Sequence, residues 1–312
     1  MAKKVPITID PARIDKNPNN PRRYFNDEKL DQLRTSLQET GVLVPLIVYE
    51  SPETPGRYIL MDGERRWRSA LDLGFKELPI SVTPPPSKLD NLLRMFNIHS
   101  VREEWSLVAV ALALRDVIKV SGEDREGRLA EMTGLTRSTV RRARRLLSLP
   151  TEELELIQDE AHLDRTEQIH REDLYLEIEA AESVLRRQLP EVAEQYDRPK
   201  IIRQFARKRE KQKLVNVTDF RYVAKLVKAA DSDLVERQKV IDAADELIRD
   251  VNATPEDVYE RVAAVAVGQQ DVARRAELLS VALDAMPRNG RLSVRLKKRL
   301  EELRAEIDQL LG

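Results

Sequence analysis

The sequence predicts a small α+β domain at the amino terminus, followed by all-helical regions that continue to the carboxyl terminus. Short β-like runs occur before the three prolines at 84–86, whereas apolar residues recur at helical spacing in the segments after them. The chain has 312 residues and a net charge of −1, with 34% charged and only 4% aromatic residues. These values are typical of helix-rich, strongly charged proteins of two or three domains.

Several kinds of site are excluded by composition. The chain has no cysteine, which rules out disulfides, thiolate nucleophiles and cysteine-bound zinc. Its longest apolar runs, residues 42–49 and 107–114, are too short to cross a bilayer, and no signal-peptide core is present. Neither a GxxxxGK[ST] nor a GxGxxG motif occurs. We therefore expect a cytoplasmic protein with no membrane partner and no P-loop or Rossmann site.

Strands and helices alternate in the first 86 residues. Leu30, Leu33 and Leu37 recur on one helical face, and Gly41 ends that helix. The turn at 51–56 contains two prolines and a glycine, so the strands that flank it form a hairpin. We expect strands at 7–9, 43–49, 57–61 and 78–82, helices at 27–40 and from 64 onward, and a proline-punctuated loop at 17–23.

The junction between the strand at 57–61 and the next helix has the composition of an anion site. Gly63 breaks the strand, and Glu64, Arg65 and Arg66 begin the helix. Backbone amides and the positive dipole end at a helix start favour phosphate, and arginines add forked hydrogen bonds. The alternative is an arginine-rich surface helix in which Glu64 and Arg68 form an ordinary ion pair.

Residues 125–147 have the proportions of a helix-turn-helix, with a break at 133–135. No acidic residue lies between Thr133 and Pro150, so the second helix is expected to present an unneutralised basic face that binds DNA phosphates. The alternative is a solvated charged face. The candidate DNA contacts are Arg137, Ser138, Thr139, Arg141, Arg142, Arg144 and Arg145.

Two features stand out in the remaining sequence. The basic stretch at 198–213 is compatible with a DNA-tracking surface or with a solvated helix. Leucine and isoleucine recur at coiled-coil spacing between 296 and 310, which favours dimerisation or an intramolecular bundle. The predicted division of the chain is 1–86, 87–165 (with the helix-turn-helix), 166–251 and 252–312.

The two main motifs together resemble the ParB family of DNA-partitioning clamps, whose amino-terminal domain shares ancestry with sulfiredoxin. Residues 41–48 resemble the family's first nucleotide motif, residues 63–70 its second, and residues 97–99 with Arg102 its third. The helix-turn-helix, which ends at 146–150, is also similar to that of the family. The resemblance covers about residues 5–160.

This resemblance implies a switch that binds CTP, or another nucleoside triphosphate, with Mg²⁺, loads on double-stranded DNA, and closes as a sliding homodimer. Some members hydrolyse CTP slowly and act with a ParA-type ATPase in chromosome or plasmid partition, which implies a nucleoid- or plasmid-associated location. By position, Asn97 would help to hold the metal and Glu64 would be the candidate catalytic residue. The implied nucleotide contacts are Gly41, Pro45, Leu46, Gly63, Glu64, Arg65, Arg66, Asn97 and Arg102, with Arg22 and Arg23 as loop contacts.

The chain departs from the family pattern at three positions. Val44 stands where the first motif has glutamine, Phe96 stands where the third has glutamate, and Arg102 matches only across a two-residue insertion. One metal-side carboxylate is therefore missing. Two other functions remain open: a helix-turn-helix transcription regulator with a degenerate nucleotide pocket, and a nucleotide-dependent kinase or nuclease with Glu64 as general base.

Overall fold

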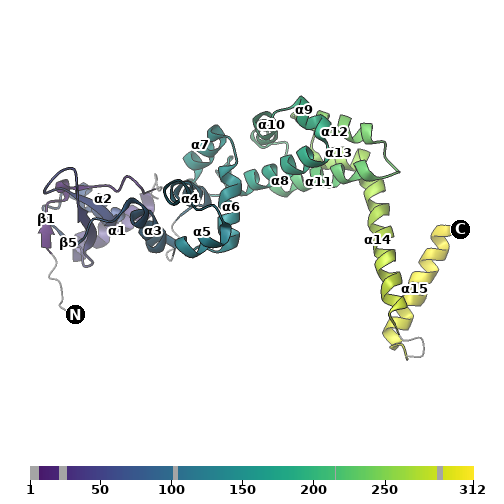
Figure 1. The fold of residues 1–312 in the computed structure, drawn as a ribbon, viewed down its shortest axis with the longest axis horizontal. Coiled ribbons are helices and arrows are strands. Elements are labelled where there is room, and N and C mark those ends of the chain that lie inside the picture. Colours follow the sequence, from purple (N-terminus) through teal and green to yellow (C-terminus); the bar gives the residue numbers. More distant parts are fainter. Residues whose placement is uncertain (1–6, 21–26, 101–104, 215, 287–290) are drawn as a thin grey trace.

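The structure is a computed structural model that describes residues 7–20, 27–100, 105–214, 216–286 and 291–312 (Figure 1). For residues 27–29 and 97–100 it describes the backbone only. The predicted order is confirmed: a mixed sheet with helices comes first, and helices follow to the carboxyl terminus.

The amino-terminal domain is built on a five-stranded sheet with the order β1-β5-β3-β4-β2. β3 and β4 form the predicted antiparallel hairpin, and β3 runs parallel to β5. The two-residue strand β2, which pairs with β4, was not predicted because it is too short to show a period. The strands are β1 (Ile7–Ile9), β2 (Ile14–Asp15), β3 (Leu46–Glu50), β4 (Tyr58–Asp62) and β5 (Leu78–Thr83).

The start of β3 differs from the prediction. We expected a strand from residue 43, but β3 begins at Leu46. Pro45 has no N–H for a ladder bond, and the carbonyl oxygens of Val44 and Pro45 accept hydrogen bonds from the Arg66 guanidinium instead. The backbone at 44–45 is therefore bound to a side chain of the next helix rather than to a strand.

Helices α1 (Asp27–Thr40) and α2 (Glu64–Asp72) pack against each other beside the sheet. The 3₁₀ turn η1 (Pro11–Arg13) contacts α2, and the Trp67 indole donates to the Pro11 carbonyl oxygen. Leu46, Val48 and Ile80 are almost fully buried in the core of this domain. The same core contains Leu46 at the start of β3 and Ala70 of α2, so it holds the two segments that flank the predicted anion site.

Beyond the sheet, one contiguous core runs through the helical part from Leu92 to Val267. The first of these helices, α3 (Lys88–Ser100), contacts β4 on one side and α4 and α5 on the other, so it joins the sheet domain to the helical body (Figure 1). The body then comprises α4 (Leu107–Ser121), α5 (Glu126–Thr133), α6 (Arg137–Leu147), α7 (Thr151–Glu160), α8 (Glu172–Gln188), α9 (Pro190–Gln195), α10 (Arg198–Glu210), η2 (Val217–Phe220), α11 (Arg221–Lys228), η3 (Ala229–Asp231), α12 (Arg237–Arg249) and α13 (Pro255–Val262).

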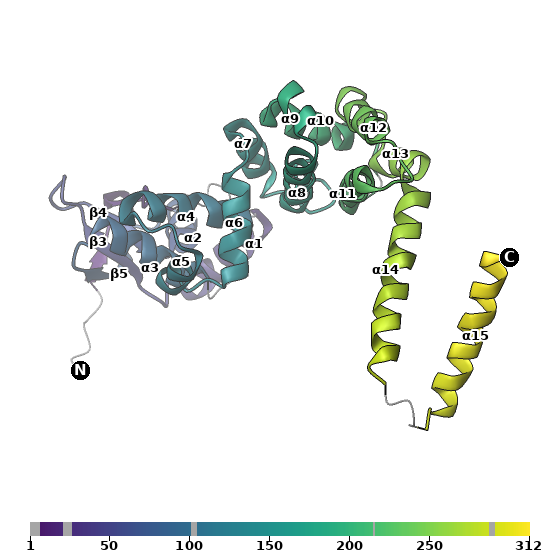
Figure 2. The same ribbon diagram turned by 45° about the vertical axis from the view of Figure 1, so that its right-hand side comes forward.

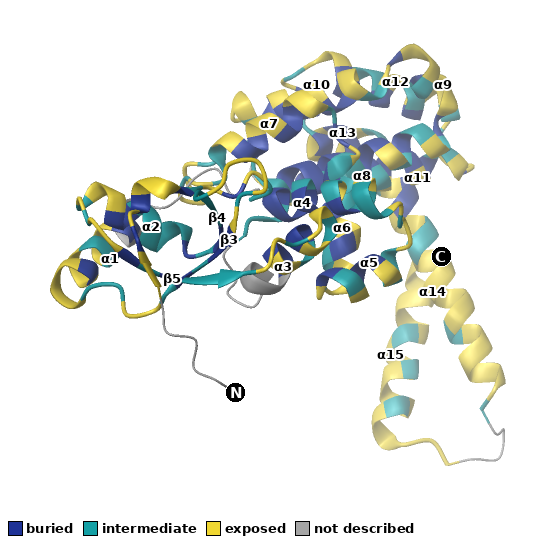
Figure 3. Cartoon of the chain, turned by 60° about the vertical axis from the view of Figure 1, so that its left-hand side comes forward, coloured by how far each residue is buried: buried dark blue, intermediate teal, exposed yellow. Residues whose placement is uncertain are grey.

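The last two helices, α14 (Ala264–Asp284) and α15 (Val294–Leu311), project away from this body (Figure 2). α14 packs against α11 and α13 only near its start. Most of its length and most of α15 are exposed (Figure 3), including Leu278 and Val281 at 64% each. An apolar surface of this kind, left uncovered in one chain, is typical of an interaction site.

Among the described residues, no helix combines the length and the apolar character that crossing a bilayer would require.

Candidate nucleotide and DNA sites

Gly63 forms the turn between β4 and α2. Its φ of 102° lies in the left-handed region that favours glycine. A Cβ at this position would lie 2.4 Å from Cδ2 of Leu46, which is itself fully buried. The Leu46 side chain of the first motif and the start of α2 are therefore in close contact at a point where only glycine fits.

Arg66 holds the first motif against α2. Its guanidinium donates to the Val44 and Pro45 carbonyl oxygens, and it lies 3.5 Å from the Asp62 carboxylate. The Val44 side chain is exposed, so the residue that replaces the family's glutamine takes part here through its backbone. In this conformation Arg66 positions the loop, and its neighbour Arg65 is partly exposed.

Glu64 is engaged by two partners. One carboxylate oxygen accepts from Arg68 at 2.6 Å, and the other accepts from the Asn20 side chain at 2.6 Å. The Glu64–Arg68 ion pair, which the alternative interpretation of this helix expected, is present. Asn20, in the loop before residue 21, was missed because nothing in its spacing relates it to a residue 44 positions away.

Gly41 follows α1 with a φ of 68°, and its N–H donates to the Leu37 carbonyl oxygen at 2.9 Å. This is the helix end that the sequence predicted. With Pro45 and Leu46, Gly41 frames the loop that lies opposite the start of α2. Leu46 faces the sheet core, so only its backbone is available to a ligand.

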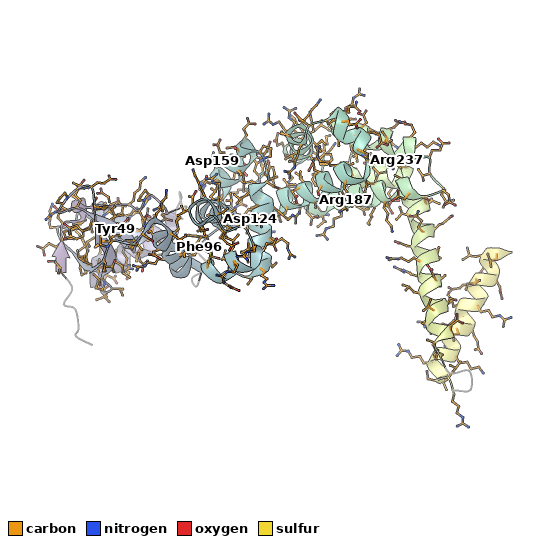
Figure 4. All side chains as sticks on the ribbon, viewed as in Figure 1. Tyr49, Phe96, Asp124, Asp159, Arg187 and Arg237 are labelled. Carbon is orange, nitrogen blue, oxygen red and sulfur yellow. The ribbon has the colours of Figure 1, made fainter. Side chains whose placement is uncertain are left out.

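Phe96 occupies the position of the expected carboxylate, and its environment accounts for the departure. The side chain, labelled in Figure 4, is fully buried in the helical core. It packs edge-to-face on Trp105, with ring centroids 5.2 Å apart. A carboxylate there would be buried without water, which is strongly unfavourable. The third motif of this chain is thus adapted to packing at this position.

The other predicted contacts remain predictions. Asn97 lies in the last turn of α3, where residues 97–100 are described by their backbone only, and Arg22, Arg23 and Arg102 lie outside the described residues. Within the part of the chain that is described, no three histidine or acidic side chains are close enough together to hold a metal.

The helix-turn-helix has the predicted geometry. Gly134, whose φ is 74°, caps the carboxyl end of α5. Thr136 caps the start of α6 by accepting a hydrogen bond from the Thr139 N–H at 3.1 Å. Val140 and Ala143 are fully buried against the helical core. The opposite face of α6 therefore points outward.

The expectation of an unneutralised basic face on α6 is wrong. Arg141 pairs with Glu126 at 3.2 Å, Arg144 with Asp124 at 2.8 Å, and Arg145 with Glu179 at 2.5 Å. The sequence could not reveal these pairs because the acids come from the turn before α5, from α5 and from α8. Among the described residues, Arg137 has no acidic partner, and it is exposed beside Ser138 at the start of α6.

The basic stretch on α10 is also partly neutralised or buried in the folded chain. Arg198 pairs with Glu182 at 3.0 Å, and Arg203 pairs with Glu152. Lys208 is fully buried and donates to the carbonyl oxygens of Asp250 at 2.6 Å and Ala253 at 2.7 Å. Several of these cations hold the helices together rather than face solvent.

The structure thus joins a mixed sheet through α3 to a helix-turn-helix, a motif that occurs in many DNA-binding proteins. Residues 2–96 match the ParB N-terminal domain family. This part of the chain belongs to the ParB N-terminal domain family.

One curated relative and two solved structures illustrate this relation. The chromosome-partitioning protein ParB of Caulobacter vibrioides (strain NA1000 / CB15N) is 38% identical over 154 residues, 48% of this chain and 48% of the relative. The crystal structure of the C-terminally truncated ParB from Caulobacter crescentus with CTP-γ-S is 31% identical, with 54% of this chain and 92% of that chain covered and a TM-score of 0.30. The structure of that protein on the centromeric parS site is 25% identical, with 71% and 98% covered and a TM-score of 0.43.

The chain spans about half the length of the curated relatives that it matches. The similarity of this chain to these proteins is evident in the sequences, whereas the whole structures do not superpose closely.

Proposed function

We propose that this chain is a nucleotide-gated DNA clamp that acts in DNA segregation, with CTP and Mg²⁺ as its ligands. The main support is the geometry at Gly63, which brings the first motif and the arginine-bearing start of α2 together. The ParB relative that was solved with CTP-γ-S and the one on parS supply the ligand classes. Arg65 and the start of α2 would bind the triphosphate, and Asn97 would help to hold the metal.

The test is nucleotide binding by the full chain, with site-directed crosslinking of the amino-terminal domain as the readout of closure. We expect crosslinking to rise only when CTP, Mg²⁺ and DNA are present together, and Arg65→Ala to abolish the rise by removing a phosphate contact. Leu71→Ala, at an exposed position of the same helix, is the matched control. If no nucleoside triphosphate binds the wild-type chain, the proposal fails.

One observation favours a second function. Phe96 fills the place of a metal-side carboxylate, which suits a helix-turn-helix regulator with a degenerate nucleotide pocket. Such a protein would bind DNA equally well with and without CTP. The kinase or nuclease alternative has less support, because both Glu64 oxygens are held by Arg68 and Asn20 rather than presented to a substrate.

DNA contact is proposed at the start of α6. Arg137→Ala is expected to weaken DNA binding about tenfold and to lower the salt slope by about 1, because one phosphate or base contact is lost. Arg187→Ala is the matched control: this arginine is exposed on α8, away from α6 (Figure 4). Binding isotherms at several salt concentrations measure both quantities. Equal slopes for the wild-type chain and Arg137→Ala would contradict the assignment.

We propose that α14 and α15 form the homodimer contact. The chain offers uncovered apolar side chains on α14, and α15 carries Leu300 and Leu303 on its repeating apolar face. Helices of this length are marginal alone and are stabilised when such faces are buried. We expect Leu300→Glu combined with Leu303→Glu to weaken self-association at least about tenfold in sedimentation equilibrium. Lys298→Gln, at an exposed position on the opposite side of the helix, should leave it unchanged.

A ParA-type ATPase as motor partner and a nucleoid or plasmid location complete the proposed role. A pull-down with the cognate ATPase would test the first.

A further inference from the structure

A buried polar cluster lies where the loop after β2, the sheet and α3 meet. Asn17 is 4% exposed, Asn91 is 3% exposed and Tyr49 is 7% exposed. The Asn17 side-chain N–H donates to Oδ1 of Asn91 at 2.9 Å, and Nδ2 of Asn91 donates to the Tyr49 hydroxyl oxygen at 3.4 Å. Three segments far apart in sequence thus satisfy one another's polar groups, as burial demands.

The turn that carries Asn17 also reaches α2. Oδ1 of Asn17 accepts from the Asn19 N–H at 3.0 Å, and the Asn20 N–H donates to the Asn17 carbonyl oxygen at 3.1 Å. These bonds fix the turn 17–20. At its other end the Asn20 side chain donates to Glu64, the first residue of α2. One four-residue turn is therefore bonded to α3 at one end and to the predicted anion site at the other.

On the far side, α3 leads to the helix-turn-helix. It contacts α4 and α5, and Phe96, five residues beyond Asn91, is fully buried in their shared core. Because such interiors are close-packed, a displacement of α3 is passed to the helices that it contacts. The path from the start of α2 to α5 is thus continuous: Glu64, the turn 17–20, Asn91, and the body of α3.

Packing alone does not account for this cluster. Two buried asparagines must each find partners in place of water, whereas leucines of similar volume would need none. Hydrogen bonds between the two amides specify one position of the turn relative to α3. Because the turn and α3 are held in one relative position, a movement of either one is passed to the other.

We propose that Asn17 and Asn91 are positioning residues that couple the nucleotide site on α2 to DNA binding by the helix-turn-helix. The inference rests on the proposed function. Coupling of this kind is reciprocal: if CTP changes the affinity for DNA, DNA changes the affinity for CTP by the same factor. The Asn17–Asn91 hydrogen bond transmits the change, and its loss uncouples two sites that each still bind.

The experiment measures the affinity of the full chain for CTP-γ-S and Mg²⁺, with and without a saturating duplex selected by this protein from a random-sequence library. The ratio of the two affinities is the coupling factor. For the wild-type chain we expect a ratio of at least about five. For Asn91→Leu we expect a ratio of about one, with each ligand alone bound within about threefold of wild type. A general loss of structure would lower both affinities and would not selectively move the ratio.

Tyr49→Phe is the matched control, because it removes the third partner and leaves the Asn17–Asn91 bond intact; its ratio should equal that of the wild type. If Asn91→Leu fails to fold, Tyr49→Phe combined with Asn91→Leu replaces it, since the buried Tyr49 hydroxyl is then not left without its partner and the turn 17–20 keeps its own hydrogen bonds. The same ratio of about one is expected for the double variant.

The outcomes separate the two claims. If CTP-γ-S does not bind the wild-type chain, or leaves its DNA affinity unchanged, the proposed function fails and the coupling fails with it. If the wild type responds and the asparagine variants respond equally, only the coupling is overturned.

Discussion

Gly63→Ala is expected to destabilise the amino-terminal domain by about 2 to 4 kcal/mol and to abolish nucleotide binding. Two costs add. The φ of 102° is unfavourable for any residue with a Cβ, and the added methyl would lie 2.4 Å from the Leu46 side chain and 3.1 Å from the Arg66 guanidinium. The second contact matters for function, because displacing Arg66 releases the Val44 and Pro45 carbonyl oxygens.

Gly41→Ala separates these costs. Gly41 has a φ of 68°, but a Cβ there meets no atom within 4 Å. Only the cost of the positive φ remains, so we expect the free energy of unfolding to fall by about 1 kcal/mol. Chemical denaturation measures both variants, and nucleotide binding is compared in the absence of denaturant. Equal losses at the two positions would show that the contact with Leu46 is not limiting.

The second large expected effect concerns Lys208, which should make the free energy of unfolding depend on pH. Burial lowers the pKa of Lys208 to about 8 from its ordinary value of 10.5, although Asp250 and Glu246 oppose the shift. Between these two pH values the folded chain has released the proton while the unfolded chain still holds it. Because the unfolded state then binds more protons, Lys208 makes the folded state more stable as the pH rises from about 8 to about 10.5.

Lys208→Met removes this dependence. The free energy of unfolding of the wild type relative to the variant should increase by up to about 3 kcal/mol across that range. Urea denaturation at pH 8 and at higher pH gives the difference, and tyrosine titration cancels because it is common to both proteins. Lys211→Met, at an exposed site just after α10, should show no such change. A pH-independent difference for Lys208→Met would contradict the role of burial.

Local patterns predicted most of the fold. The helix at 27–40, the hairpin and the helix-turn-helix each depend on residues near one another in sequence, so period, turn composition and caps were sufficient. Gly63 was predictable for the same reason, because a glycine placed directly between a strand and a helix is typical of a tight turn with a positive φ.

The contacts that the sequence did not predict join distant residues. Arg145 meets Glu179 only because α8 packs against α6, and Asn17 meets Asn91 across 74 positions. The burial of Phe96 likewise depends on Trp105 and the helices around it. Charge counts along one helix cannot include acids that folding supplies from elsewhere, and this is why the basic face of α6 was overestimated.

The unbroken core from Leu92 to Val267 has a mechanical consequence. It makes the helical body a single lever with α6 near one end and the base of α14 at the other. The 21 residues of α14 extend this lever by about 30 Å. A small change in the angle at which α6 meets a duplex would therefore produce a large displacement of the far end of α14. The proposed contact between two copies of the chain lies on α14 and α15.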